Sequence, residues 1–159
     1  SPVALEKVKK LLQRQKKMIK AYVAEAQPIL ESGEVALAHA YSGDTLQVHK
    51  KNPNIEYVFP KEGGEVFIDN LAIPKGAPLP ERAKEFIHFT LDRKTAAQQA
   101  KSLFFSPVLN LSGLPGMEEL LKNPIVFPGK EQTQKYELMN DNPQRMEAIQ
   151  RLWTELKSS

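Results

Sequence analysis

Phe67 and Asp69 lie two residues apart in a segment rich in β-branched and aromatic side chains. Side chains alternate between the faces of a strand, so the ring and the carboxylate are predicted to point the same way. An ionised carboxylate is almost never buried alone. Either an Arg or Lys of the same protein, or a bound organic ammonium lying on the ring, would satisfy it. Taken alone, the pattern favours the internal ion pair, because ion-pair networks perturb carboxylates as readily as sites do.

A second aromatic residue, Tyr41, ends a predicted buried strand over residues 35–41. Ser42 is the expected N-cap of a helix that runs to about Lys51, with Asp44 favourable near its positive end. Ligands in open α/β sheets bind beyond the carboxyl ends of strands. The turn after Tyr41 would therefore present backbone N–H groups and a ring to a ligand, although a lone tyrosine at the end of a strand more often packs in the core.

Strands and helices must position these side chains. Residues 55–59 and 66–73 are predicted strands, joined by a turn at residues 60–64 that holds Gly63 and Gly64. Apolar residues recur at helical spacing elsewhere, with Asp92 or a neighbour separating two helices and Asn142 capping the last. The predicted helices span residues 5–22, 26–32, 81–91, 95–103, 117–121 and 143–156.

The first twenty residues are strongly basic, with seven Lys and Arg side chains against Glu6 alone. Such a cluster suits nucleic acid or an anionic membrane. The basic residues fall between apolar ones at helical spacing, which favours an amphipathic helix with a solvated basic face. The aromatic interleaving and glycine-rich loops of nucleic-acid modules are missing from the sequence.

The composition limits the remaining classes of protein. At 159 residues, 41% apolar and 26% charged, the chain suits one globular domain with a core. It has 0 Cys, which excludes disulfides, thiolate zinc sites and a cysteine nucleophile. His39, His49 and His88 show no short ligand spacing, and hydrolase, P-loop and dinucleotide motifs are missing. The sequence therefore predicts no enzyme, metal site or cofactor.

The chain resembles the C-terminal part of the periplasmic spermidine/putrescine-binding proteins, the solute receptors of polyamine ABC transporters. The matching segments are GEVALAHAYSGD (33–44), FPKEGGEVFIDNLAIP (59–74) and AKEFIHFTLDRKTAAQQA (83–100), followed by an aromatic-Ser-Pro loop and a terminal amphipathic helix. The resemblance implies an α/β chain that forms part of a two-lobed periplasmic-binding-protein-like fold. Its helices would pack on a small mixed sheet, with the N-terminal lobe largely missing.

Family topology implies a division of the chain between two lobes. Residues 1–74 would form a portion of the C-terminal lobe ending at the hinge strand, 75–105 would supply helices to the N-terminal lobe, and 106–159 would return. We expect a periplasmic protein, with its signal peptide in the missing N-terminal region. As a fragment it would bind polyamine weakly or not at all, and its unpaired strand edges favour dimerisation or swapping.

The resemblance also implies where the ligand binds. Family members hold the methylene chain with aromatic rings and the ammonium groups with carboxylates. Tyr41 and Phe67 match the ring positions, where tryptophan is commoner, and Asp69 matches the carboxylate. The implied partners are a polyamine and the ABC transporter permease in the membrane, with no nucleic acid.

Two further positions depart from the family pattern. A ligand tyrosine matches Phe104 if no gap is allowed and Phe105 if one is, and a ligand glutamine falls near Met139, which has no amide. These departures leave open a receptor of the same fold for another small amine with a sensory role. An interaction module that uses the basic helix at 5–22 is the alternative from a different class.

Overall fold

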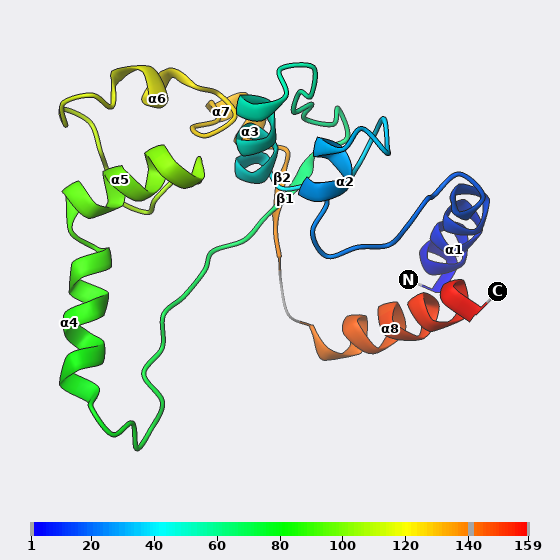
Figure 1. The fold of residues 1–159 in the computed structure, drawn as a ribbon. Helices are drawn as coiled ribbons and strands as arrows, with labels where there is room; N and C mark the ends of the chain where they lie inside the picture. The colour runs from blue at the N-terminus through cyan, green and yellow to red at the C-terminus, as the bar shows by residue number, and fades with distance from the viewer. Residues whose placement is uncertain (1, 140–141, 159) are drawn as a thin grey trace. The chain divides into compact units, whose positions relative to one another are not determined.

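The computed structural model describes residues 2–139 and 142–158, and its elements fall into two compact units. Unit 1 comprises Ser1–Ala24 with Met139–Ser159, and unit 2 comprises Glu25–Leu138. Unit 1 contains helices α1, Pro2–Lys16, and α8, Pro143–Ser158 (Figure 1). No helix among the described residues is both long and apolar enough to cross a membrane.

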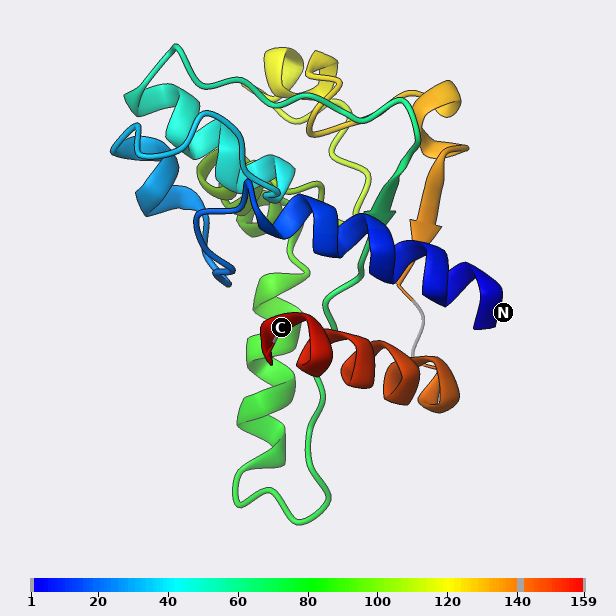
Figure 2. The ribbon, with the colours of Figure 1, turned by 90° about the vertical axis from the view of Figure 1, so that its right-hand side faces the viewer.

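In unit 1, α1 and α8 lie side by side and run in the same direction (Figure 2). Leu152 and Leu156 of α8 are buried, and the Lys9 ammonium lies 2.5 Å from the Glu155 carboxylate. Lys16 Nζ donates to the carbonyl oxygen of Leu156 at 2.7 Å. The pair is thus held by an apolar seam with polar contacts beside it.

The structure confirms the predicted start of α8 and contradicts the predicted end of α1. The cap on α8 is confirmed, because the backbone N–H of Arg145 donates to Asn142 Oδ1 at 3.0 Å. The extension of the first helix to residue 22 is wrong, since α1 ends at Lys16. Beyond it, the ring of Tyr22 meets Trp153 edge to face with centroids 4.7 Å apart. That contact stabilises a chain direction that a continued helix would not take.

Unit 2 contains a sheet of two parallel strands, β1, Gly64–Val66, and β2, Tyr136–Leu138. The preceding turn is confirmed: the Gly63 N–H donates to the Pro60 carbonyl at 3.1 Å. The predictions of longer paired strands over 35–41, 55–59 and 66–73 are wrong in the described residues. A strand needs a neighbour for its N–H and C=O groups, and β1 and β2 form the one ladder in the described residues.

The helices of unit 2 agree closely with the periodicity of the sequence. Tyr41, not Ser42, is the N-cap residue of α3, and it makes no side-chain cap hydrogen bond. The helix α7 was not expected from the sequence. The six helices are α2 Gln27–Glu31, α3 Ser42–Lys51, α4 Pro80–Thr90, α5 Arg93–Leu103, α6 Glu118–Lys122 and α7 Lys130–Thr133.

Two small apolar clusters hold unit 2 together. One joins α2 to α3 through Ala26, Leu30 and Val48. The other packs the alanine face of α5 against the loop that leads into α6, and its buried members are Ala96, Ala97, Ala100, Leu111 and Met117. Because α3 contacts both α2 and α5, its first turn lies beside the end of α5.

Asp92 caps α5 and makes this helix sensitive to acid. Its Oδ1 accepts hydrogen bonds from the backbone N–H groups of Lys94 and Thr95, each at 3.0 Å. The Thr95 N–H holds the pKa of this carboxyl below its usual range. The folded-state pKa is therefore lower than the unfolded one. The capping contribution to stability is present above about pH 4 and is lost as the pH falls through the folded pKa.

Asp92→Ser is expected to keep a cap that does not titrate, so stability should fall less steeply below about pH 4 than in the parent chain. Urea unfolding at a series of acidic pH values, followed by circular dichroism, measures the difference. Identical pH profiles for the two proteins would contradict the assignment.

Candidate functional site

Tyr41 and Phe67, which are far apart in the sequence, meet in the structure. Their ring centroids are 5.1 Å apart with an interplanar angle of 67°, an edge-to-face contact. Tyr41 stands at the N-terminus of α3, and Phe67 directly follows β1. Tyr41 and Phe67 are 48% and 36% exposed, so the pair presents aromatic surface to solvent.

Asp69 follows two residues after Phe67, in an exposed segment outside the helices and strands. The Asn70 side chain donates to the Ile68 carbonyl at 2.8 Å and supports the local backbone. Within residues 2–139 and 142–158, no Lys or Arg forms an ion pair with Asp69. The internal ion pair that the pattern alone favours is therefore not formed there, and the carboxylate is open to an external cation.

The first turn of α3 packs directly on the loop after α5. A Cβ placed on Gly43 would lie 2.7 Å from the Leu103 carbonyl oxygen and 2.8 Å from ring carbons of Phe105. The helix thus approaches this loop with a backbone surface that carries no side chain. Phe105 therefore lies against Gly43, which is two residues along the chain from Tyr41, the N-cap residue of α3.

Phe104 is placed differently from Phe105. It ends α5 in the left-handed conformation with φ 57°, and its ring lies 4.4 Å from the Lys50 ammonium at the far end of α3. An internal cation therefore occupies the Phe104 ring. The geometry thus brings Phe105, and not Phe104, to the turn that follows Tyr41.

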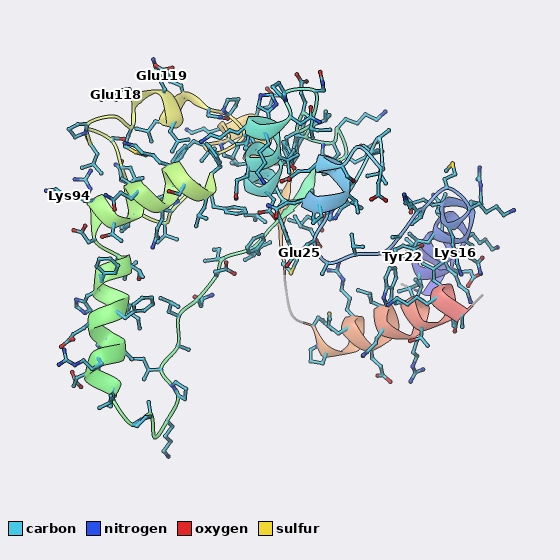
Figure 3. The ribbon with its side chains drawn as sticks, viewed as in Figure 1. Lys16, Tyr22, Glu25, Lys94, Glu118 and Glu119 are labelled. Atoms are coloured by element: carbon cyan, nitrogen blue, oxygen red, sulfur yellow. The ribbon has the colours of Figure 1, made fainter. Side chains whose placement is uncertain are left out.

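The sequence predicts for Asp44 only a favourable charge near the start of α3. It lies in the first turn of the helix, three residues along the chain from Tyr41. Burial raises the pKa of Asp44, and the nearby carboxylate of Glu25, labelled in Figure 3, raises that pKa further. The Tyr-x-x-Asp spacing was the signal that would have found this residue.

Met139, the remaining predicted site residue, takes part in neither aromatic contact. It follows β2, belongs to unit 1 and has an exposed side chain. The structure therefore brings together Tyr41 and Phe67, with Asp69 just beyond. Groups of three or more metal-binding side chains are not found among the described residues.

Exposed rings and, two residues further along the chain, a carboxylate without an ion-pair partner in the described residues are side chains that can bind an organic cation. The sequence profile of the family described as bacterial extracellular solute-binding protein matches residues 1–127. The chain belongs to this family. Its helices and small sheet match part of a periplasmic-binding-protein fold, as the resemblance implied.

Curated relatives agree with this assignment. The chain is 32% identical over 137 residues to the putrescine-binding periplasmic protein SpuD of Pseudomonas aeruginosa, which covers 81% of this chain and 37% of that protein. It is 30% identical over 141 residues to the spermidine/putrescine-binding periplasmic protein of Salmonella typhimurium, covering 87% and 39%. The matching protein of Escherichia coli is 32% identical over 117 residues, covering 73% and 33%. The chain thus spans between a third and two fifths of the length of each of these relatives.

Proposed function

We propose that this chain is the ligand-contacting part of a polyamine receptor, the substrate-binding component of a polyamine ABC uptake system. The observation that carries the proposal is the Tyr41–Phe67 ring pair followed by Asp69, a carboxylate without an ion-pair partner in the described residues. The names of the relatives supply the class of ligand. The role is binding without a chemical step, in the periplasm, with the transporter permease as the partner.

Polyamines suit these side chains in two ways. Each ring attracts an ammonium group by about 0.5–2 kcal/mol and buries the neighbouring methylene groups. Asp69 and Asp44 would each accept charge-assisted hydrogen bonds from ammonium groups. A cation bound at Asp44 would favour its charged form, and so would oppose the effect of burial on its pKa. Phe105 is the third ring we place in the site, because it lies against Gly43.

In our proposal the isolated chain supplies only part of this pocket. Residues 1–74 and 106–159 would belong to the C-terminal lobe and 75–105 to the N-terminal lobe of a two-lobed receptor. The exposure of both rings and the short span relative to the homologues support the proposal that the pocket is incomplete in this chain. We expect spermidine to bind the 159-residue chain only weakly, and an affinity in the micromolar range or tighter would refute the fragment proposal.

Asp69→Asn is expected to weaken polyamine binding at least about tenfold, because the amide cannot form the charge-assisted bond to an ammonium group. The measurement is an NMR titration of the chain with spermidine at millimolar concentration, followed at the backbone signals of Tyr41 and Phe67. The same substitution in a longer protein containing this chain should show the loss by calorimetry.

Glu56→Gln serves as the matched control, since it removes one exposed carboxylate from the same unit. It should leave the titration unchanged. 1-Butanol, which lacks the ammonium groups of putrescine, should cause no shifts at Asp69. Equal binding by Asp69→Asn and the parent would refute the site, whereas a preference for another small amine over putrescine, spermidine and spermine would support the sensory alternative.

A further inference from the structure

The outer face of α1 carries four basic residues in a single line. They follow one another at intervals of three, four and three residues, which places them on one side of the helix and of the turn after it. All four side chains are exposed, and none forms an ion pair within the described residues. This basic stripe consists of Lys7, Lys10, Arg14 and Lys17.

The partner helix α8 does not neutralise the basic stripe. The basic residues of α1 that α8 contacts are Lys9, which pairs with Glu155, and Lys16, which donates to the Leu156 carbonyl. Both lie on the inner side together with the half-buried Leu5 and Leu12. Inner and outer basic residues are thus distinct sets.

The basic stripe is unfavourable for the isolated helix. Like charges three and four residues apart repel one another and destabilise the helix that carries them. Glu6 is the one acidic residue of α1, and it adjoins the stripe four residues before Lys10. The remaining repulsion would be relieved by an anionic partner on the outer face.

An apolar strip adjoins the basic stripe. Val8, Leu11 and Met18 are 47%, 52% and 82% exposed. Leu11 lies four residues after Lys7 and three before Arg14, so the apolar and basic lines are neighbours on the helix surface. Exposed apolar side chains next to Lys and Arg are typical of helices that lie in a membrane interface. A nucleic acid would be bound mainly through its phosphates, which would not contact the apolar strip favourably.

We propose that the outer face of α1 docks on an anionic phospholipid surface. The basic stripe would contact the head groups, and the apolar strip would reach the boundary of the acyl chains. This contact is separate from solute binding, because every residue in it belongs to unit 1, whereas Tyr41, Phe67 and Asp69 belong to unit 2.

The test is co-sedimentation of the 159-residue chain with vesicles of pure phosphatidylcholine, and with vesicles that also contain about 30% phosphatidylglycerol. We expect at least about tenfold tighter binding to the anionic vesicles, and weakening as salt is added. Changing all four stripe residues to Gln should weaken this binding by about 600-fold, since each basic residue near the surface contributes about fivefold.

The matched control changes four exposed lysines of unit 2 to Gln, namely Lys75, Lys94, Lys130 and Lys135, of which Lys94 lies in the first turn of α5 (Figure 3). It alters the net charge equally and should leave vesicle binding within about twofold of the parent. A second variant, Val8→Ser with Leu11→Ser, should weaken binding while the stripe is intact. Circular dichroism at about 222 nm, where helices absorb, should be unchanged and would show that the variants keep their helices.

Three results would overturn the proposal. One is equal binding to neutral and anionic vesicles, and another is equal loss of binding in the stripe variant and its control. The third is tighter binding to duplex DNA than to the anionic vesicles at the same salt concentration, which would assign the stripe to phosphates of nucleic acid.

Discussion

Gly63→Ala is expected to lower the free energy of unfolding of unit 2 by about 3 kcal/mol. Gly63 has φ +115°, a conformation that residues with a Cβ rarely adopt, and an added Cβ would overlap the backbone carbonyl oxygen of Lys135. That carbonyl also accepts the hydrogen bond from Gly64 N–H at 3.2 Å. Relief of the overlap would therefore disturb the start of the β1–β2 ladder. Urea unfolding followed by far-ultraviolet circular dichroism measures the loss.

Gly113→Ala separates the effect of the contact from that of the backbone conformation. Gly113 has φ +79°, but nothing lies within 4 Å of an added Cβ. Only the conformational cost of about 1 kcal/mol is expected there. Equal losses in the two variants would show that the approach of Lys135 has no energetic consequence.

Gly43→Ala has the second largest expected effect, a loss of about 2 kcal/mol in the free energy of unfolding. Gly43 lies inside α3, where alanine is normally better than glycine by about 1 kcal/mol. A loss would therefore have the opposite sign to helix propensity. Its cause is the close approach of the Leu103 carbonyl and the Phe105 ring, at 2.7 and 2.8 Å from the added Cβ.

Two further variants test this explanation. Gly129→Ala, where nothing lies within 4 Å of the added Cβ, should change stability by less than about 0.5 kcal/mol. Phe105→Leu combined with Gly43→Ala should lose less than the two single losses summed, because the ring is one of the two obstructing groups. A Gly43→Ala protein more stable than the parent would contradict this explanation, because it would mean that Leu103 and Phe105 move aside without a cost in free energy.

Displacement of Phe105 should also reach the ligand site. In our proposal Gly43 sets the distance between the Phe105 ring and the turn that carries Tyr41 and Asp44. Spermidine-induced NMR shifts at Tyr41 should therefore shrink in Gly43→Ala under conditions where the protein remains folded. Full shifts in a destabilised but folded Gly43→Ala protein would remove Phe105 from the site.

Most helices could be predicted because their signals are local. The spacing of apolar residues, Pro28 and Pro143 in first turns, and the caps at Asp92 and Asn142 all act within a few residues. The sequence signal for the turn at Gly63 is local as well. The end of α1 was not, because the Tyr22–Trp153 contact joins segments from opposite ends of the chain.

Strand pairing was the weakest prediction, and its failure has a physical cause. β-branched and aromatic residues indicate an extended backbone, but a ladder forms only where another strand supplies hydrogen-bond partners. Residues 35–41 have the composition of a strand and no paired neighbour in the described part of the chain. The local sequence therefore indicates a preference for a strand, but it does not indicate whether a second strand is available to pair with it.

The candidate site shows the same division. The sequence by itself determined its chemistry: rings at Tyr41 and Phe67, and a carboxylate two residues beyond on an extended segment. Only the tertiary structure decided that the two rings touch, that Asp69 meets no basic side chain in the described residues, and that Phe105 faces Gly43 while Lys50 covers Phe104. Residue types follow from the sequence alone, whereas contacts between distant segments depend on how helices and loops pack.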